Sequence, residues 1–171
     1  VFRLANVWML AQPYGYPTVL SSFAFTCPAG NSAGPPSDAA GWTLPVRCAA
    51  SFEVVVLGDW VCEHRDPYIR NMIRFRRTVA GTDVTRWWDN AGNAIAFSRG
   101  DKGWVAINRE GGNVLVSTST GLAAGTYCDV LGGGKVGAGC AGASVVVGTS
   151  GGVALSLAGN SALVIDVTMK L

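Results

Sequence analysis

The segment from Trp60 to Gly81 has the hydrophobic pattern of a single amphipathic helix. Its apolar positions recur at three- and four-residue spacing, at Ile69, Met72, Ile73, the aliphatic stem of Arg76, and Val79. The opposite, solvated face carries Arg70, Arg74 and Arg77. Asp66 can cap this helix, Pro67 suits its first position, and Gly81 supplies a left-handed stop. The pattern therefore predicts a helix that begins after Asp66 and ends before Gly81.

The part of the chain before this helix has a weaker pattern. Residues 1–13 are typical of a helix interior, with one side expected to carry Val1, Leu4, Ala5, Trp8 and Ala11. No capping residue, initiating Met or targeting segment precedes them, so we expect the chain to be part of a longer protein. The stretch TVLSSF, residues 18–23, is short and apolar at both ends, which predicts a buried parallel strand. A helix, a tight turn and such a strand form half of a repeating βα unit.

Residues 24–59 lose this periodicity. The stretch from Thr26 to Gly41 is rich in Gly, Pro and Ser, which predicts a loop. Residues 52–57, FEVVVL, favour a strand, but no partner for it is evident nearby. A connection of this length inside a compact domain is usually functional or poorly ordered.

The chain after Gly81 has the pattern of an all-β domain. Seventeen of the 23 glycines follow residue 90, and they separate short β-type runs. We predict strands over residues 84–89, 94–99, 103–108, 114–119, 125–130, 144–148, 153–157 and 162–169. Eight strands at this spacing predict a sandwich or a Greek-key barrel with its own core.

Composition narrows the class of protein. Only 14% of the 171 residues are charged and the net charge is +2, which excludes the strongly basic surface that nucleic-acid binding needs. Hydrophobic residues make up 49%, yet no apolar run approaches the roughly 18 residues of a membrane span. We therefore expect neither a nucleic acid nor a membrane as a partner.

Five cysteines indicate an oxidising compartment, with at most two pairs and one thiol left over. Cys128 and Cys140 flank a glycine-rich hairpin tip, where a bridge would contribute roughly 3 kcal/mol on the chain-entropy estimate. Cys48 and Cys62 could bridge across residues 49–61. Cys27 is then unpaired, or it pairs in some other way.

Two residue groups are candidates for chemistry. Asp59, Glu63 and Asp66 crowd near His64, but with Cys62 they fall short of four ligands at zinc spacing, so capping and a disulfide explain them better. Trp87, Trp88 and Trp104 could stack on sugar rings. Because adjacent residues of a strand face opposite sides, at least one of the Trp87–Trp88 pair belongs to the core.

Several motifs together resemble the C-terminal part of animal-type α-amylases in glycoside hydrolase family 13. They are PYGYPTVLSSF, AGPPSD, DWVCEHRDPYIRNMIRFRR, VTRWWDNAGNAIAFSRGDKGWVAINRE, GLAAGTYCDV and the closing KL. The resemblance spans nearly the whole chain in order and spacing, and it is weakest over residues 37–58. WVCEHR and the Trp-Trp-Asp-Asn run followed by Phe-Ser-Arg-Gly are its most distinctive parts.

The resemblance implies a two-part architecture. Residues 1–81 would be the last helix–strand–helix of a (β/α)8 TIM barrel, with residues 1–13 as its seventh helix, 18–23 its eighth strand and 66–80 its eighth helix. Residues 82–171 would be domain C, an antiparallel Greek-key β domain. The family's disulfides would fall on Cys48–Cys62 and Cys128–Cys140, while Cys27 has no counterpart.

The resemblance also implies a function. The relatives are secreted enzymes that cleave internal α-1,4 bonds of starch and glycogen with retention, and we expect a monomer. Their three catalytic acids and their calcium ligands lie on earlier barrel strands, so none is placed on this chain, and the 171 residues alone are expected to be inactive.

One functional position falls inside the chain. Thr18 occupies the place of an Arg or Lys that binds chloride in many animal-type α-amylases, and a threonine hydroxyl cannot replace that cation. Chloride dependence is therefore doubtful. An alternative is that the chain is a non-catalytic carbohydrate-binding or structural β module. Such a module does not need the barrel-type segment of residues 1–80.

Overall fold

The computed structural model describes residues 1–26, 34–51 and 53–171. The chain divides into two compact units, one formed by Val1–Pro17 together with Pro67–Leu171 and the other by Thr18–Asp66. The predicted domain boundary between residues 81 and 82 is a different division. It rests on the family resemblance, whereas the two units are defined by packing, and it stays a prediction. Cys27 lies outside the described residues.

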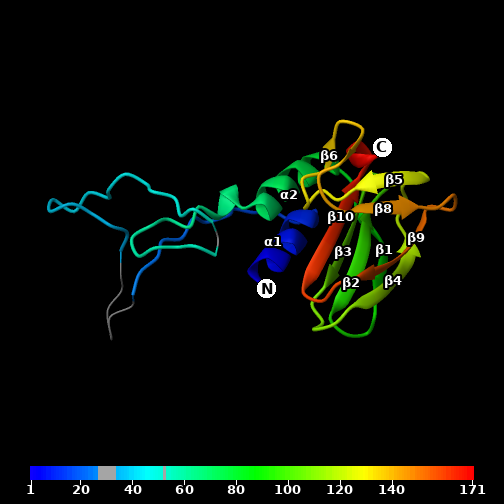
Figure 1. Cartoon of the computed structure of the whole chain (residues 1–171), viewed down its shortest axis with the longest axis horizontal. Coiled ribbons are helices and arrows are strands. Elements are labelled where there is room, and N and C mark those ends of the chain that lie inside the picture. The colour runs from blue at the N-terminus through cyan, green and yellow to red at the C-terminus, as the bar shows by residue number, and fades with distance from the viewer. Residues whose placement is uncertain (27–33, 52) are drawn as a thin grey trace. The chain divides into compact units, whose positions relative to one another are not determined.

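Two helices pack together in the first unit, α1 (Phe2–Ala11) and α2 (Pro67–Thr78), as Figure 1 shows. Helix α2 forms where the pattern predicted it and buries Ile69, Met72 and Phe75. The three arginines of its predicted solvated face are exposed. One position corrects the predicted stripe: Phe75 is fully buried, whereas Ile73 is only half-buried.

Helix α1 is present, but the side expected to carry Val1, Leu4, Ala5, Trp8 and Ala11 is only partly buried. The structure buries Leu4, Asn6, Val7, Leu10 and Ala11 and leaves Val1, Ala5 and Trp8 exposed. The helix is apolar on almost every side, so its sequence pattern cannot choose the side that faces the core. The packing against α2 makes that choice.

Four antiparallel strands form the main sheet in the order β1–β2–β3–β10: Val84–Asp89, Ala94–Arg99, Gly103–Asn108 and Ser161–Asp166. Three smaller ladders pair β4 (Val114–Ser119) with β9 (Gly152–Leu157), β5 (Gly125–Cys128) with β8 (Ser144–Val147), and β6 (Lys135–Val136) with β7 (Gly139–Cys140). The pairings of β3, β4 and β5 with β10, β9 and β8 are nested, which gives the predicted all-β architecture with multiple antiparallel sheets.

The centre of the main sheet is buried on both faces. Phe97, Val105 and Val164 lie in register on one face, and Trp104 and Ile165 lie opposite each other on the other face; all are fully buried. Helix α2 covers the first face at Gly103, where a side chain would meet the ring of Phe75 at 2.6 Å and Val79 at 2.7 Å. Glycine is therefore required at this point of helix–sheet contact.

The second unit, Thr18–Asp66, has little regular structure among its described residues. It contains one 3-10 turn, Glu63–Arg65, and isolated bridges from Phe23 and Cys48 to Trp60 and from Ser37 to Thr43. The predicted strand over residues 18–23 does not form, because only Phe23 finds a partner. Residues 53–57 also lack the predicted strand, and Phe52 lies outside the described residues.

Candidate functional site

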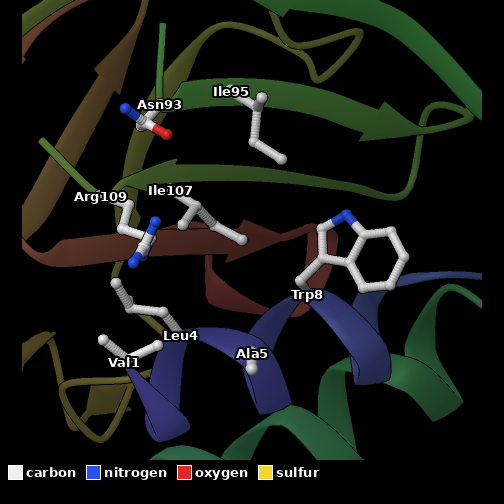
Figure 2. Close-up of a pocket in the computed structure, with 8 residues that line it drawn as sticks. All are labelled: Val1, Leu4, Ala5, Trp8, Asn93, Ile95, Ile107 and Arg109. Atoms are coloured by element: carbon white, nitrogen blue, oxygen red, sulfur yellow. The ribbon is translucent and has the colours of Figure 1, made fainter.

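A groove of about 240 Å³ lies between α1, the start of strand β2 and the end of strand β3 in the first unit (Figure 2). Six of the eight residues that line it are apolar: Val1, Leu4, Ala5 and Trp8 from the helix side, and Ile95 and Ile107 from the sheet. Asn93 and Arg109 supply the polar lining. Figure 2 shows Trp8 at one end of the groove and Asn93 and Arg109 toward the other.

The two walls of the groove follow from local structure. Ile95 and Ile107 are cross-strand partners in the β2–β3 ladder, so their side chains lie on the same face of the sheet. On the helix, Val1, Ala5 and Trp8 are three or four residues apart and share one side of α1. Most of the side of α1 that the sequence pattern grouped together therefore forms the wall of an open groove.

Hydrogen bonds hold the polar end of the groove. The backbone N–H of Asn93 donates to Oε1 of Glu110 at 2.6 Å, and the amide of Asn90 donates to the same oxygen at 3.3 Å. These bonds, that of the Asn93 backbone first, lower the pKa of Glu110. The N–H of Arg109 donates to the carbonyl of Asn93 at 2.9 Å. Among the described residues, no hydrogen bond or ion pair holds the Arg109 guanidinium.

Two other guanidinium groups fix the helix wall. Arg99, which is 2% exposed, donates to the carbonyls of Ala11, Val79 and Thr82. Burial, and then the neighbouring charge of Arg76, lower the pKa of Arg99. These acceptors lie at the C-terminal ends of α1 and α2, where unpaired carbonyls carry negative partial charge.

Arg76 completes this arrangement from α2. Its guanidinium donates to the carbonyls of Leu10 and Gln12 at the end of α1, and to those of Tyr14 and Gly15 at 3.4 and 2.8 Å in the turn that follows. The sequence analysis counted only the aliphatic stem of Arg76 and missed this polar role. A buried position for Arg in an otherwise apolar stripe was the signal for it.

The three candidate tryptophans have different surroundings. Trp87 is 53% exposed and stacks on Phe97 with ring centroids 5.7 Å apart, while its Nε1 donates to Asp89. Trp88 is half-buried. Trp104 is fully buried, so its ring face cannot receive a sugar and we withdraw it as a stacking candidate.

The remaining candidates lie in the second unit or concern the cysteines. Thr18 is exposed, at the start of that unit. Disulfides join Cys48 to Cys62 and Cys128 to Cys140, the pairs proposed from the sequence.

The acidic residues near His64 have structural partners. Asp59 pairs with Arg47, and Glu63 accepts hydrogen bonds from the backbone and hydroxyl of Ser22, whereas His64 is exposed. Within the described ranges, no three side chains of His, Cys, Asp or Glu come together as a metal site. No helix there is long and apolar enough to cross a bilayer.

Comparison with known proteins defines the class of the β region. Residues 87–168 match the family of α-amylase C-terminal all-beta domains. Over nearly its whole length the chain is also similar to complete animal enzymes. It is 41% identical to an α-amylase of Tenebrio molitor over 173 residues, which is 99% of this chain and 36% of that protein. It is 40% identical to a pancreatic α-amylase of Struthio camelus, covering 94% of this chain and 33% of that protein.

A solved structure agrees with these relatives. A mutant of α-amylase I from Eisenia fetida in complex with maltohexaose superposes with a TM-score of 0.83 at 32% identity, over 97% of this chain and 35% of that one. The predicted resemblance to the C-terminal part of animal α-amylases is therefore confirmed. The chain spans about a third of the length of the curated relatives it matches.

Proposed function

We propose that this chain is the C-terminal portion of an endo-acting α-amylase that hydrolyses internal α-1,4-glucosidic bonds of starch and glycogen with retention. The observation that carries the proposal is identity of about 40% with whole animal α-amylases across 94–99% of the chain. The match to the C-terminal domain family alone would fit a binding module. The match of residues outside 87–168 to the same enzymes favours a catalytic parent.

In this proposal the chain serves as scaffold. Helices α1 and α2 act as the seventh and eighth helices of a (β/α)8 barrel, residues 18–23 as its eighth strand, and residues 82–171 as domain C. A barrel strand pairs with neighbours on both sides, and the other seven strands are not in this chain. The absence of those neighbours accounts for the lack of a strand at residues 18–23, whose only bridge is the one from Phe23 to Trp60.

The reactive groups belong to the rest of the parent enzyme. A retaining glycosidase needs two carboxyl groups about 5–5.5 Å apart, and in barrels of this kind they lie at the C-terminal ends of strands. The resemblance puts the calcium ligands on earlier barrel strands, so we assign calcium to the part of the parent enzyme outside this chain. Two disulfides support secretion into an oxidising compartment, and we propose that the enzyme is a monomer.

A chimera tests the proposal. The part of the Tenebrio molitor α-amylase that has no counterpart in this chain is joined in front of Val1, and reducing-sugar release from starch is measured. We expect hydrolysis by the chimera and none by the 171-residue chain alone. A folded chimera that leaves starch intact would count against the proposal.

The same chimera tests the chloride position. Thr18 cannot provide the cationic contact of an Arg, so we expect activity that changes little when chloride is removed. Thr18→Arg should make the activity of the chimera rise with added chloride. Strong chloride activation without that substitution would contradict the role given to Thr18.

A second function, contact with α-glucan at Trp87, is favoured by one observation. The Trp87 indole is half exposed and held flat against Phe97, which gives a rigid aromatic surface. Starch granules should retain the 171-residue chain, and Trp87→Ala should reduce that retention. Trp42→Ala, at a position that is 75% exposed in the other unit, serves as the matched control.

A further inference from the structure

Within the first unit, helix α1 exposes an apolar surface that no described residue of that unit covers. Arg3 is its only charged residue, and Phe2 and Trp8 are 48% and 47% exposed. A helix that is hydrophobic on nearly all sides is normally buried on nearly all sides. Here one side packs on α2 and the sheet, while the side with Val1, Ala5 and Trp8 forms the groove wall.

The chemistry of the groove favours a polypeptide over a sugar. Three of its lining residues, Leu4, Ile95 and Ile107, have aliphatic side chains that offer no hydrogen bonds to hydroxyl groups. Arg109 is the only charged side chain that lines the groove, and it is exposed with no ion-pair partner among the described residues. Apolar side chains flanked by one carboxylate would satisfy both features.

We propose that this groove seats an apolar segment of the α-amylase polypeptide that lies outside these 171 residues, with an acidic side chain of that segment paired to Arg109. The inference rests on the proposed function. The relatives supply the length that such a segment needs, because about two thirds of each of them has no counterpart in this chain. The groove would thereby join the β domain to the rest of the enzyme through α1, β2 and β3.

Thiol accessibility tests whether the groove is occupied, independently of catalysis. Ala5→Cys places a thiol on the groove wall, in a Cys27→Ser background because Cys27 belongs to neither disulfide. We expect a maleimide probe to label it rapidly in the 171-residue chain and at least about tenfold more slowly in the Tenebrio molitor chimera. Ala154→Cys, at an exposed position of β9, is the matched control and should label equally in both proteins.

The outcomes separate this inference from the proposed function. Protection of the thiol in a chimera that does not cleave starch supports an occupied groove and counts against the proposed function. Equal labelling of the thiol in the 171-residue chain and in an active chimera overturns the occupied groove and leaves the proposed function intact. A chimera that misfolds while the 171-residue chain folds also counts against an occupied groove, because the supplied segment then does not fit it.

Two other occupants would also overturn the inference. Concentration-dependent protection in the 171-residue chain would identify a second copy, and protection by added maltohexaose would identify a glucan. The charge pair has its own measurement: Arg109→Glu should restore labelling of the groove thiol in the chimera, whereas Arg109→Lys should not. Lys102→Glu, an equal charge change in the exposed turn before β3, should leave the protection unchanged.

Discussion

The β region and the segment Thr18–Asp66 contain similar apolar runs, but only one of them forms strands. Runs such as AIAFSR and GWVAIN become β2 and β3, with every residue of β3 buried. Runs of the same kind at residues 18–23 and 53–57 form no strand, and Leu20, Val54, Val56 and Leu57 are 59–79% exposed. Both regions contain apolar runs of this kind, so the difference lies in the partners available to each run.

A strand is stable when neighbouring strands satisfy its backbone and cover its side chains. Each long strand of the β region pairs with another strand encoded within about 60 residues of it. Residues 18–23 read as a parallel strand, and parallel strands need neighbours reached through long crossovers. Apolar sequence therefore predicts a strand only where the same chain also provides the strands beside it.

The largest expected effect comes from emptying the core beside the sheet. Phe75 is fully buried and its ring lies against Gly103, so Phe75→Ala should cost about 3–5 kcal/mol of unfolding free energy. Trp42 is 75% exposed, and Trp42→Ala should change that free energy by no more than about 0.5 kcal/mol. Urea unfolding followed by circular dichroism measures both. Equal losses would show that the second unit has a core of its own.

A second comparison uses two arginines. Arg99 is almost completely buried and donates to three carbonyls at the helix ends. Arg99→Met should cost about 3 kcal/mol because it leaves the carbonyls of Ala11 and Thr82 unsatisfied. The Arg47 side chain is 72% exposed beside Asp59, and Arg47→Met should cost less than about 1 kcal/mol. Thermal unfolding of both variants gives the comparison. A harmless Arg99→Met would mean that water replaces the guanidinium at those carbonyls.

The two disulfides extend the comparison to covalent links. Cys128–Cys140 closes a loop inside the β region, and replacing both residues by Ser should cost roughly 3 kcal/mol on the chain-entropy estimate. Cys48–Cys62 closes a loop of similar length in the second unit. Its removal should leave the main unfolding transition in place and speed proteolysis of residues 49–61. A fall of the main transition by the same amount in both variants would contradict this division.

The sequence predicted the β region well because its signals are local. Four strands, β1 to β4, have the predicted bounds, and Gly and Asn turns mark their ends. The hairpin tip between Cys128 and Cys140 was predicted, but its strands β6 and β7 were missed because they have two residues each, too few for an alternating pattern. The predicted strand over residues 162–169 ends early, since Asp166 caps a 3-10 turn at Val167–Met169.

The candidate groove could not be predicted for a different reason. Its walls come from α1 and from β2 and β3, about 90 residues apart in the chain. The pattern of α1 placed four of the residues that line the groove, Val1, Leu4, Ala5 and Trp8, on one side of the helix, but it could not show that this side borders a groove. Only the packing of α1 on α2 reveals which side stays open. Arg109 gave no signal, because a single cation after a strand is typical of any solvated turn.

The smallest effect concerns the polar end of the groove and depends on pH. Hydrogen bonds from Asn93 and Asn90 lower the pKa of Glu110 below its usual 4.5 in the folded protein. A depressed acid contributes stability above its unfolded pKa and loses it as the pH falls through the folded value. Glu110→Gln should therefore lower the thermal midpoint slightly at neutral pH, with the difference vanishing in acid. Asp101→Asn, at an exposed carboxylate without a hydrogen-bond partner among the described residues, should show no such trend. A difference in thermal midpoint between Glu110→Gln and the parent chain that persists in acid would show that the carboxylate charge does not stabilise the turn at Asn90 and Asn93.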